Sequence, residues 1–182
     1  MGDLQIPVFS TVAAKGVVDE HLPWAAGVFT GDGKALAPES YIVARADLVI
    51  GLGLRNLEVL TPKAFTVPLV LLDTVADLSV ALGFDAAEIL MPAEPMHFKS
   101  LLDGLRAKSW GGEVVSESAS SVRRYLTRGE WLPGNVLVTL QALLPDPNCL
   151  VVDTGSFCTV AEHLWRAKAH KSFVASANGR YM

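Results

Sequence analysis

Cysteine, positive charge and long apolar runs are all scarce in this sequence of 182 residues. Its two cysteines, Cys149 and Cys158, are too few for a disulfide framework, and no cysteine or histidine has zinc-ligand spacing. The formal net charge is −4 and no basic run occurs, which argues against nucleic-acid binding and a polybasic membrane tether. No apolar run is long enough to span a bilayer, and the first residues lack the features of a signal peptide. We therefore expect a cytoplasmic protein.

Hydrophobic residues make up 51% of the sequence, which is enough to build a sizeable core. Apolar runs of strand length occur at Ile6–Phe9, Asp47–Leu54, Val67–Leu72, Ile89–Leu90 and Leu150–Val152. They lack polar alternation, which is typical of parallel strands buried on both faces. Helical patterns separate them, at Pro38–Ala46, Met96–Lys108, Gly134–Leu144 and Val160–Lys168. The alternation predicts an α/β fold, in which a Rossmann-like parallel sheet carries helices on both faces.

The composition changes between residues 109 and 121, where serines and paired glycines predict a linker or a surface loop. We place a domain boundary in this part of the chain. The prediction is a first α/β domain over residues 1–110, a linker over residues 111–132, and a partial second α/β unit over residues 133–182.

A glycine-rich turn follows the strand predicted at Asp47–Leu54. Gly51 and Gly53 let the backbone turn tightly there, and the start of a following helix can bind phosphate. Arg55 follows them and can pair with a phosphate, although a surface ion pair is the more ordinary role for this side chain. Two glycines without a third fit an ordinary tight turn equally well.

A second small polar turn follows the strand predicted at Leu150–Val152. Asp153, Gly155, Ser156 and Phe157 occupy it, and a helix is predicted to follow. Main-chain N–H groups at such a turn can hold a diphosphate. An ordinary loop between a strand and a helix is the equal alternative.

The remaining polar motifs carry no site by themselves. Gly31-Asp32-Gly33, followed by Asn56, is similar to the magnesium-diphosphate motif of thiamine diphosphate enzymes, in which aspartate and asparagine oxygens hold Mg²⁺. Asp-Gly is also a strong turn dipeptide, and we favour the turn. The neighbouring acids Asp19 and Glu20 would not face each other on a helix, so we expect them to be solvated.

A series of short motifs follows one order along the chain. Its members are Pro7-Val8, Thr11, Lys15-Gly16, Asp19-Glu20, His21-Leu22-Pro23, Gly27, Ala46–Arg55 and Val70–Asp73. In this order they resemble the central domain of thiamine diphosphate-dependent enzymes of the acetolactate synthase and 2-oxo acid decarboxylase type. Further on, residues 133–156 resemble the opening of the diphosphate-binding domain of that family, and residues 173–182 resemble the segment before its next helix.

The resemblance implies that this chain is a part, a split subunit or a degenerate relative of such a decarboxylase or carboligase. Residues 1–110 would be the central domain without its first strand and helix, and residues 133–182 the start of the diphosphate-binding domain. Thiamine diphosphate and Mg²⁺ would serve the complete assembly, and some relatives also bind FAD or ADP. The resemblance places the diphosphate contact at Asp153, Gly155, Ser156 and Phe157, and a nucleotide contact at Gly51, Gly53 and Arg55.

The same resemblance predicts no turnover by this chain alone, because we recognise neither the glutamate-bearing activating domain nor the metal motif in it. Asp32 and Asn56 would then not be metal ligands. The alternative is a non-catalytic module that binds ADP or FAD, or that mediates oligomerisation. The expected partner is a second copy or a complementing catalytic chain, which fits the high mean hydropathy of +0.35. An NAD-dependent dehydrogenase is disfavoured because the three-glycine fingerprint is missing.

Overall fold

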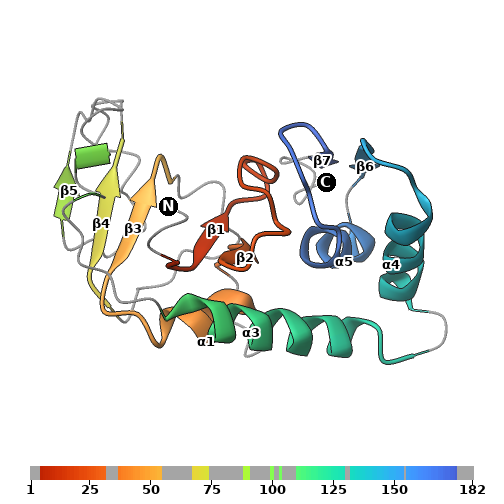
Figure 1. Ribbon diagram of the computed structural model, residues 1–182, viewed down its shortest axis with the longest axis horizontal. Coiled ribbons are helices and arrows are strands. Elements are labelled where there is room, and N and C mark those ends of the chain that lie inside the picture. The colour runs from red at the N-terminus through yellow and green to blue at the C-terminus, as the bar shows by residue number, and fades with distance from the viewer. Residues whose placement is uncertain are drawn as a thin grey trace.

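The fold is mixed α/β with short parallel strands, which confirms the predicted class. The computed structural model describes residues 5–31, 37–54, 67–73, 88–90, 99–100, 103, 110–129, 132–153 and 155–175. Its strands form three small sheets that follow one another along an elongated molecule (Figure 1). A Rossmann-like sheet with helices on both faces therefore stays a prediction.

The first sheet pairs β1 (Val8–Ser10) with β2 (Ala25–Val28) in parallel, and it lies in the middle of the molecule (Figure 1). The apolar run at Ile6–Phe9 predicted β1 to within two residues. We did not predict β2, because Ala-Ala-Gly-Val has little of the β-branched and aromatic character of a strand. Its small side chains suit its surroundings, since Ala26 is buried against helices α1 and α3, introduced below.

The second sheet has the order β3-β4-β5, with all strands parallel. It consists of β3 (Val49–Leu52), β4 (Leu69–Leu72) and β5 (Glu88–Leu90). Each strand lies within or next to a predicted apolar run. Leu69 and Leu71 of β4 are buried and form a core with Val49 and Phe29.

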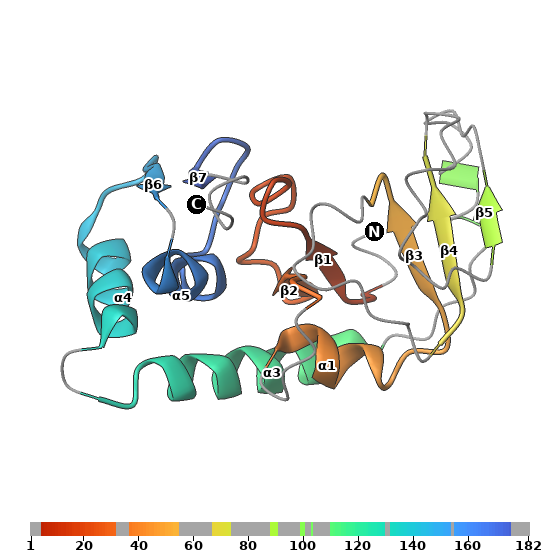
Figure 2. The same cartoon turned by 180° about the vertical axis from the view of Figure 1, so that it is seen from behind.

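Two helices run along one side of the first sheet (Figures 1 and 2). They are α1 (Pro38–Val43), which the sequence predicted, and α3 (Gly111–Leu126), which it did not. The alternative of a surface loop was wrong for residues 111–121, because they belong to this helix, and the domain boundary stays a prediction. The buried positions of α3 follow a helical stripe of small residues, namely Gly111, Val115, Ser118 and Val122. This helix contacts α1 and β2 as well as the two helices that follow it.

The last elements are α4 (Pro133–Leu143), β6 (Leu150–Val152), α5 (Ser156–Leu164) and β7 (Phe173–Ala175). The prediction for α4 was correct to within one residue at each end. Helix α5 begins four residues before the predicted start and ends four residues before the predicted end. Strand β7 was not predicted; it pairs with β6 in parallel. The buried core of this part consists of Leu137, Ala161, Trp165, Ala167 and Phe173.

Two further findings concern the predicted elements. Of the helix predicted at Met96–Lys108, residues 99, 100 and 103 are helical and the others lie outside the described residues. Among the residues that the structure describes, no helix is long and apolar enough to cross a membrane.

Candidate functional site

The turn between β6 and α5 lies at the carboxyl end of a parallel strand and leads directly into a helix. Gly155 is the N-cap residue of α5, and Ser156 is its first helical residue. The φ angle of Gly155 is 112°, a conformation that other residues rarely adopt. The backbone of this turn therefore depends on glycine.

This turn has exposed main-chain donors. The first N–H groups of any α-helix lack partners within the helix, and α5 has no side-chain cap. Asp153, Gly155, Ser156 and Phe157 are all exposed, and a Cβ added at Gly155 would meet nothing within 4 Å. The structure thus brings the four predicted diphosphate contacts together in one open turn, while Thr154 lies outside the described residues.

The glycine turn after β3 has a different construction. Gly51 is buried, and a Cβ added to it would lie 2.7 Å from Leu71 Cδ2. Gly53 is exposed at a φ of 61°, and its N–H donates to the Leu72 carbonyl oxygen at 2.7 Å. Gly51 therefore serves close strand packing, whereas Gly53 makes the turn.

An acidic residue follows the neighbouring strand at the same edge of this sheet. Leu52 lies opposite Leu72 in the parallel register of β3 and β4, so Gly53 and Asp73 come next on adjacent strands. Asp73 is only 6% exposed. Sequence reasoning missed this juxtaposition, although an acid about 20 residues after a glycine turn is the signal that finds it.

The two glycine turns do not form one site. The β3-β4-β5 sheet lies at one end of the molecule, and α5, β6 and β7 lie toward the other, as both views show (Figures 1 and 2). Arg55, the third residue predicted for the nucleotide contact, lies outside the described residues. Asp32 and Asn56 also lie outside them.

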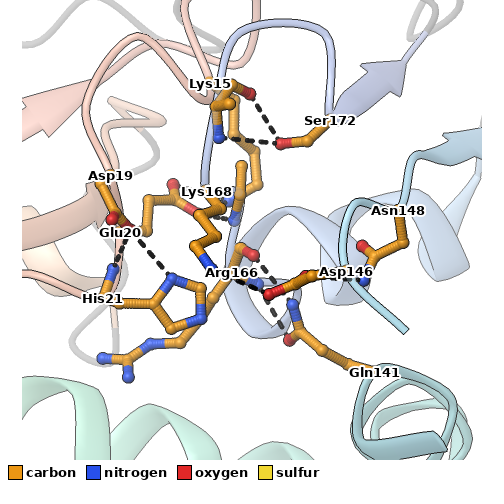
Figure 3. Close-up of polar contacts among 12 residues, drawn as sticks. Lys15, Asp19, Glu20, His21, Gln141, Asp146, Asn148, Arg166, Lys168 and Ser172 are labelled. Carbon is orange, nitrogen blue, oxygen red and sulfur yellow. Dashed lines mark hydrogen bonds and ion pairs between the residues drawn. The ribbon is translucent and has the colours of Figure 1, made fainter. Parts of the chain in front are cut away.

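A buried ion pair that sequence reasoning missed lies in the loop after β1. Lys15 and Glu20 are 3% and 6% exposed, and Lys15 Nζ lies 2.7 and 2.6 Å from the two carboxylate oxygens of Glu20 (Figure 3). The expectation that Glu20 is solvated was therefore wrong. Its neighbour Asp19 is partly exposed and accepts a hydrogen bond from His21 at 2.9 Å.

The electrostatics of this cluster depend on its burial. Burial lowers the pKa of the Lys15 ammonium from 10.5, and the carboxylates of Glu20 and Glu162 oppose that shift. Glu162 is 1% exposed and accepts a hydrogen bond from Cys158 Sγ at 3.3 Å. Lys15 and Glu20, which belong to motifs of the resemblance, thus provide structural contacts in the interior.

A second buried carboxylate organises the end of β2. Glu39 Oε1 accepts hydrogen bonds from Thr30 Oγ1 at 2.6 Å and from the N–H groups of Thr30 and Gly31 at 3.0 and 2.9 Å. Its other oxygen, Oε2, is buried and has no hydrogen-bond partner among the described residues. Glu39 therefore fixes the backbone of Thr30 and Gly31, directly after β2.

A resident metal ion would need several ligating side chains close together. Among the described residues, no group of three or more His, Cys, Asp or Glu side chains could hold one. Comparison with known proteins does not assign the chain, since no protein-family profile matches it and no curated protein is significantly similar to it.

Proposed function

We propose that this chain forms part of a thiamine diphosphate-dependent enzyme of the acetolactate synthase and 2-oxo acid decarboxylase type. In this proposal, the turn between β6 and α5 contacts the diphosphate of the cofactor. The observation that carries the proposal is the exposed start of α5 at Gly155 and Ser156, at the carboxyl end of a parallel strand. The order of the sequence motifs supports it independently.

The chemistry of the turn suits a diphosphate. The N–H groups of Ser156 and Phe157 lie at the positive end of the helix dipole, where anionic oxygens bind favourably. Gly155 leaves open space above the backbone, so that phosphate oxygens can approach it closely. When bound, thiamine diphosphate supplies the carbanion chemistry at the 2-oxo acid, and this turn anchors and orients it.

The described residues do not fit Mg²⁺ by themselves. Asp153 is the one carboxylate among the described residues of the turn, and a hard divalent cation needs several oxygen ligands. We assign those ligands, and the group that activates the cofactor, to residues outside the described part or to a complementing chain. The proposal includes a Rossmann-like sheet with helices on both faces for the complete domains.

A binding measurement on two glycine variants tests the proposal. We expect Mg²⁺ with thiamine diphosphate to raise the thermal unfolding midpoint, since a ligand at 100 times its Kd stabilises by about 2.7 kcal/mol. Gly155→Ala forces a side chain onto a φ of 112°, so affinity should fall at least about tenfold. Gly112→Ala is the matched control, because a Cβ there meets nothing within 4 Å. Equal affinities of the two variants would contradict the role of the turn.

The second candidate is a non-catalytic module that binds ADP or FAD at the other end of the molecule. The observation in its favour is that Gly53 and Asp73 follow adjacent parallel strands at one sheet edge. A carboxylate in that position can accept hydrogen bonds from ribose hydroxyls, as in other nucleotide-binding sheets. Together with Gly51 and Arg55, these residues would form the nucleotide contact.

Titration with ADP and FAD distinguishes the two candidates. If the chain is a module that binds ADP or FAD, either ligand stabilises the protein. Asp73→Asn then weakens the binding of that ligand about tenfold, and Gly155→Ala has no effect on the binding. A response to Mg²⁺ with thiamine diphosphate alone would exclude the second candidate.

A further inference from the structure

The loop after β1 contacts the segment after α5 through the main chain of Ala167. The N–H of Glu20 donates to the Ala167 carbonyl oxygen at 3.0 Å, and Glu20 Oε2 accepts from the Ala167 N–H at 2.7 Å. One residue thus satisfies both main-chain groups of Ala167, which is fully buried. This contact fixes the position of the chain directly beyond the end of α5.

Two further contacts hold the same segment. Gly16 lies so close to Ala169 that an added Cβ would be 2.3 Å from the Ala169 carbonyl oxygen. Lys15 Nζ lies 5.3 Å from the centroid of the Phe173 ring, in the range of a cation–π contact. The loop therefore contacts the chain between α5 and β7, and also β7 itself.

Two of these contacts, those with Ala167 and Phe173, involve Lys15 and Glu20, which are themselves paired. Removing either member leaves the other as an unpaired buried charge, which is far more costly than replacing both. Lys15 Nζ also holds the Glu20 carboxylate, whose Oε2 accepts from the Ala167 N–H. The pair therefore acts as one unit, the Lys15–Glu20 clamp.

Helix α5 connects the clamp with the turn at its other end. The helix spans nine residues, Ser156–Leu164, or about 13 Å. Its end continues into Trp165, which is 1% exposed and packs with Ala161 and Phe173. Because such a core is close-packed, a shift of Ala167 moves the helix as a rigid body.

We propose that Lys15 and Glu20 are positioning residues for the turn between β6 and α5. By holding Ala167, they set the place at which the first N–H groups of α5 meet a diphosphate. This inference rests on the proposed function for the identity of the ligand. The mechanical coupling between the clamp and α5 does not depend on it.

A neutral pair of double variants isolates the contact with Ala167. Lys15→Met with Glu20→Gln removes both charges and keeps an amide oxygen that accepts from the Ala167 N–H. Lys15→Met with Glu20→Met removes both charges and the acceptor at similar volume. Asp19→Asn is the control, because it changes the neighbouring, partly exposed acid and leaves the clamp intact.

Hydrogen exchange and ligand affinity are the two measurements, made on the full chain. In the Met/Met variant, we expect exchange over residues 156–164 at least about tenfold faster than in the Met/Gln variant. Residues 69–72 of β4, at the far end, should exchange alike in both, so a general loss of stability is distinguishable. Affinity for Mg²⁺ with thiamine diphosphate should be about tenfold lower in the Met/Met variant than in the Met/Gln variant. Asp19→Asn should resemble the unmodified protein in both measurements.

The outcomes separate the two proposals. If the unmodified chain does not bind Mg²⁺ with thiamine diphosphate, the proposed diphosphate role of its turn fails, and exchange alone decides the coupling. If both double variants exchange equally over residues 156–164, the positioning role is overturned whatever the ligand result. If exchange differs but affinity does not, the clamp holds α5 without positioning the ligand, and the inference is again overturned.

Discussion

The carboxylate of Glu20 and the main-chain N–H of Ala167 are 147 residues apart in the sequence and 2.7 Å apart in the fold. A contact of such separation closes a very long loop, whose closure costs chain entropy. It ties the beginning of the chain to the core around Trp165. Together with the contacts of α3 with β2 and α5, it joins the early and late parts of the chain.

Two glycines near opposite ends of α3, one crowded and one in open space, should respond oppositely to alanine. A Cβ on Gly134 would lie 2.2 Å from the Leu126 carbonyl oxygen and 2.9 Å from Leu164 Cδ1. Gly134→Ala should lower the free energy of unfolding by about 1–3 kcal/mol, because the backbone must move. Gly112→Ala lies in open space within α3 and should raise it by up to about 1 kcal/mol.

Urea titration measures both effects through the midpoint at an unchanged slope. If Gly134→Ala is neutral, the close approach of α3 and α4 at this position is wrong. A destabilising Gly112→Ala would contradict the helical state of α3, which replaced the predicted surface loop.

The hydroxyl group of Tyr41 connects α1 to α3 and should titrate late. It donates to Glu117 Oε2 at 2.6 Å, and this hydrogen bond raises the pKa of Tyr41 above 10.0. The bond exists only while the phenol is protonated, so its stabilisation is present below pH 10 and is lost as pH rises through the raised pKa. Glu117→Ala should bring the titration midpoint of Tyr41 back toward its usual value.

Nuclear magnetic resonance of ¹³C-labelled tyrosine rings follows this titration residue by residue. An unchanged midpoint for Tyr41 in Glu117→Ala would show that the two helices do not meet through this pair.

The partly exposed acid Asp19 should contribute to stability only at pH values above those at which its carboxyl group titrates. The main-chain N–H of His21 donates to Asp19 Oδ1 at 2.9 Å and lowers the pKa of this carboxyl below 3.8. The folded state therefore favours the charged form, so the stabilisation is present above pH 3.8 and is lost as pH falls through the lowered pKa. Because solvent screens the group, Asp19→Asn should cost less than about 1 kcal/mol.

Unfolding free energies at about pH 6 and at about pH 2 give the comparison. The loss of unfolding free energy in Asp19→Asn should be present at the higher pH and vanish at the lower pH. A deficit that persists in acid would mean that asparagine disturbs the loop in some other way.

The outward face of the β6–β7 pair should promote association with another copy or another chain. Val151 and Val174 are register partners that are 70% and 45% exposed, whereas parallel sheets are normally covered on both faces. Val151→Glu should weaken self-association at least about tenfold, because a contact would bury an unpaired charge. Val17→Glu is the matched control, since Val17 is 68% exposed on a loop.

Analytical ultracentrifugation over a range of concentrations measures this association. Equal behaviour of the two variants would exclude the β6–β7 face as the contact. A monomeric unmodified protein at every concentration would contradict self-association and favour a complementing chain.

The parts of the fold that sequence reasoning predicted are those whose cause is local. The strands β3, β4 and β6 could be predicted because each is a short apolar run without polar alternation. Strand β2 was missed because Ala25 and Ala26 become strand residues only through burial under α1 and α3. The turn at Gly155 was found because a strand, a glycine and a helix follow one another directly.

Helix α3 and the burial of Glu20 could not be predicted, because their causes are not visible in the local sequence. The buried stripe of α3 consists of small residues, so the pattern of serines and glycines conceals its helical period. Glu20 owes its burial partly to Ala167, a residue at the far end of the sequence. Only the tertiary structure brings such partners together.

Because α3 is a helix, its length sets both the distance and the rotation between the elements before it and those after it. Its 16 residues extend over about 24 Å, and each further residue would add about 1.5 Å and turn the next element by about 100°. A flexible tether would absorb a one-residue insertion without consequence. In this molecule, the same insertion would rotate α4 and α5 away from the loop at Glu20, so insertions or deletions in α3 are acceptable only in multiples that restore the turn of the helix.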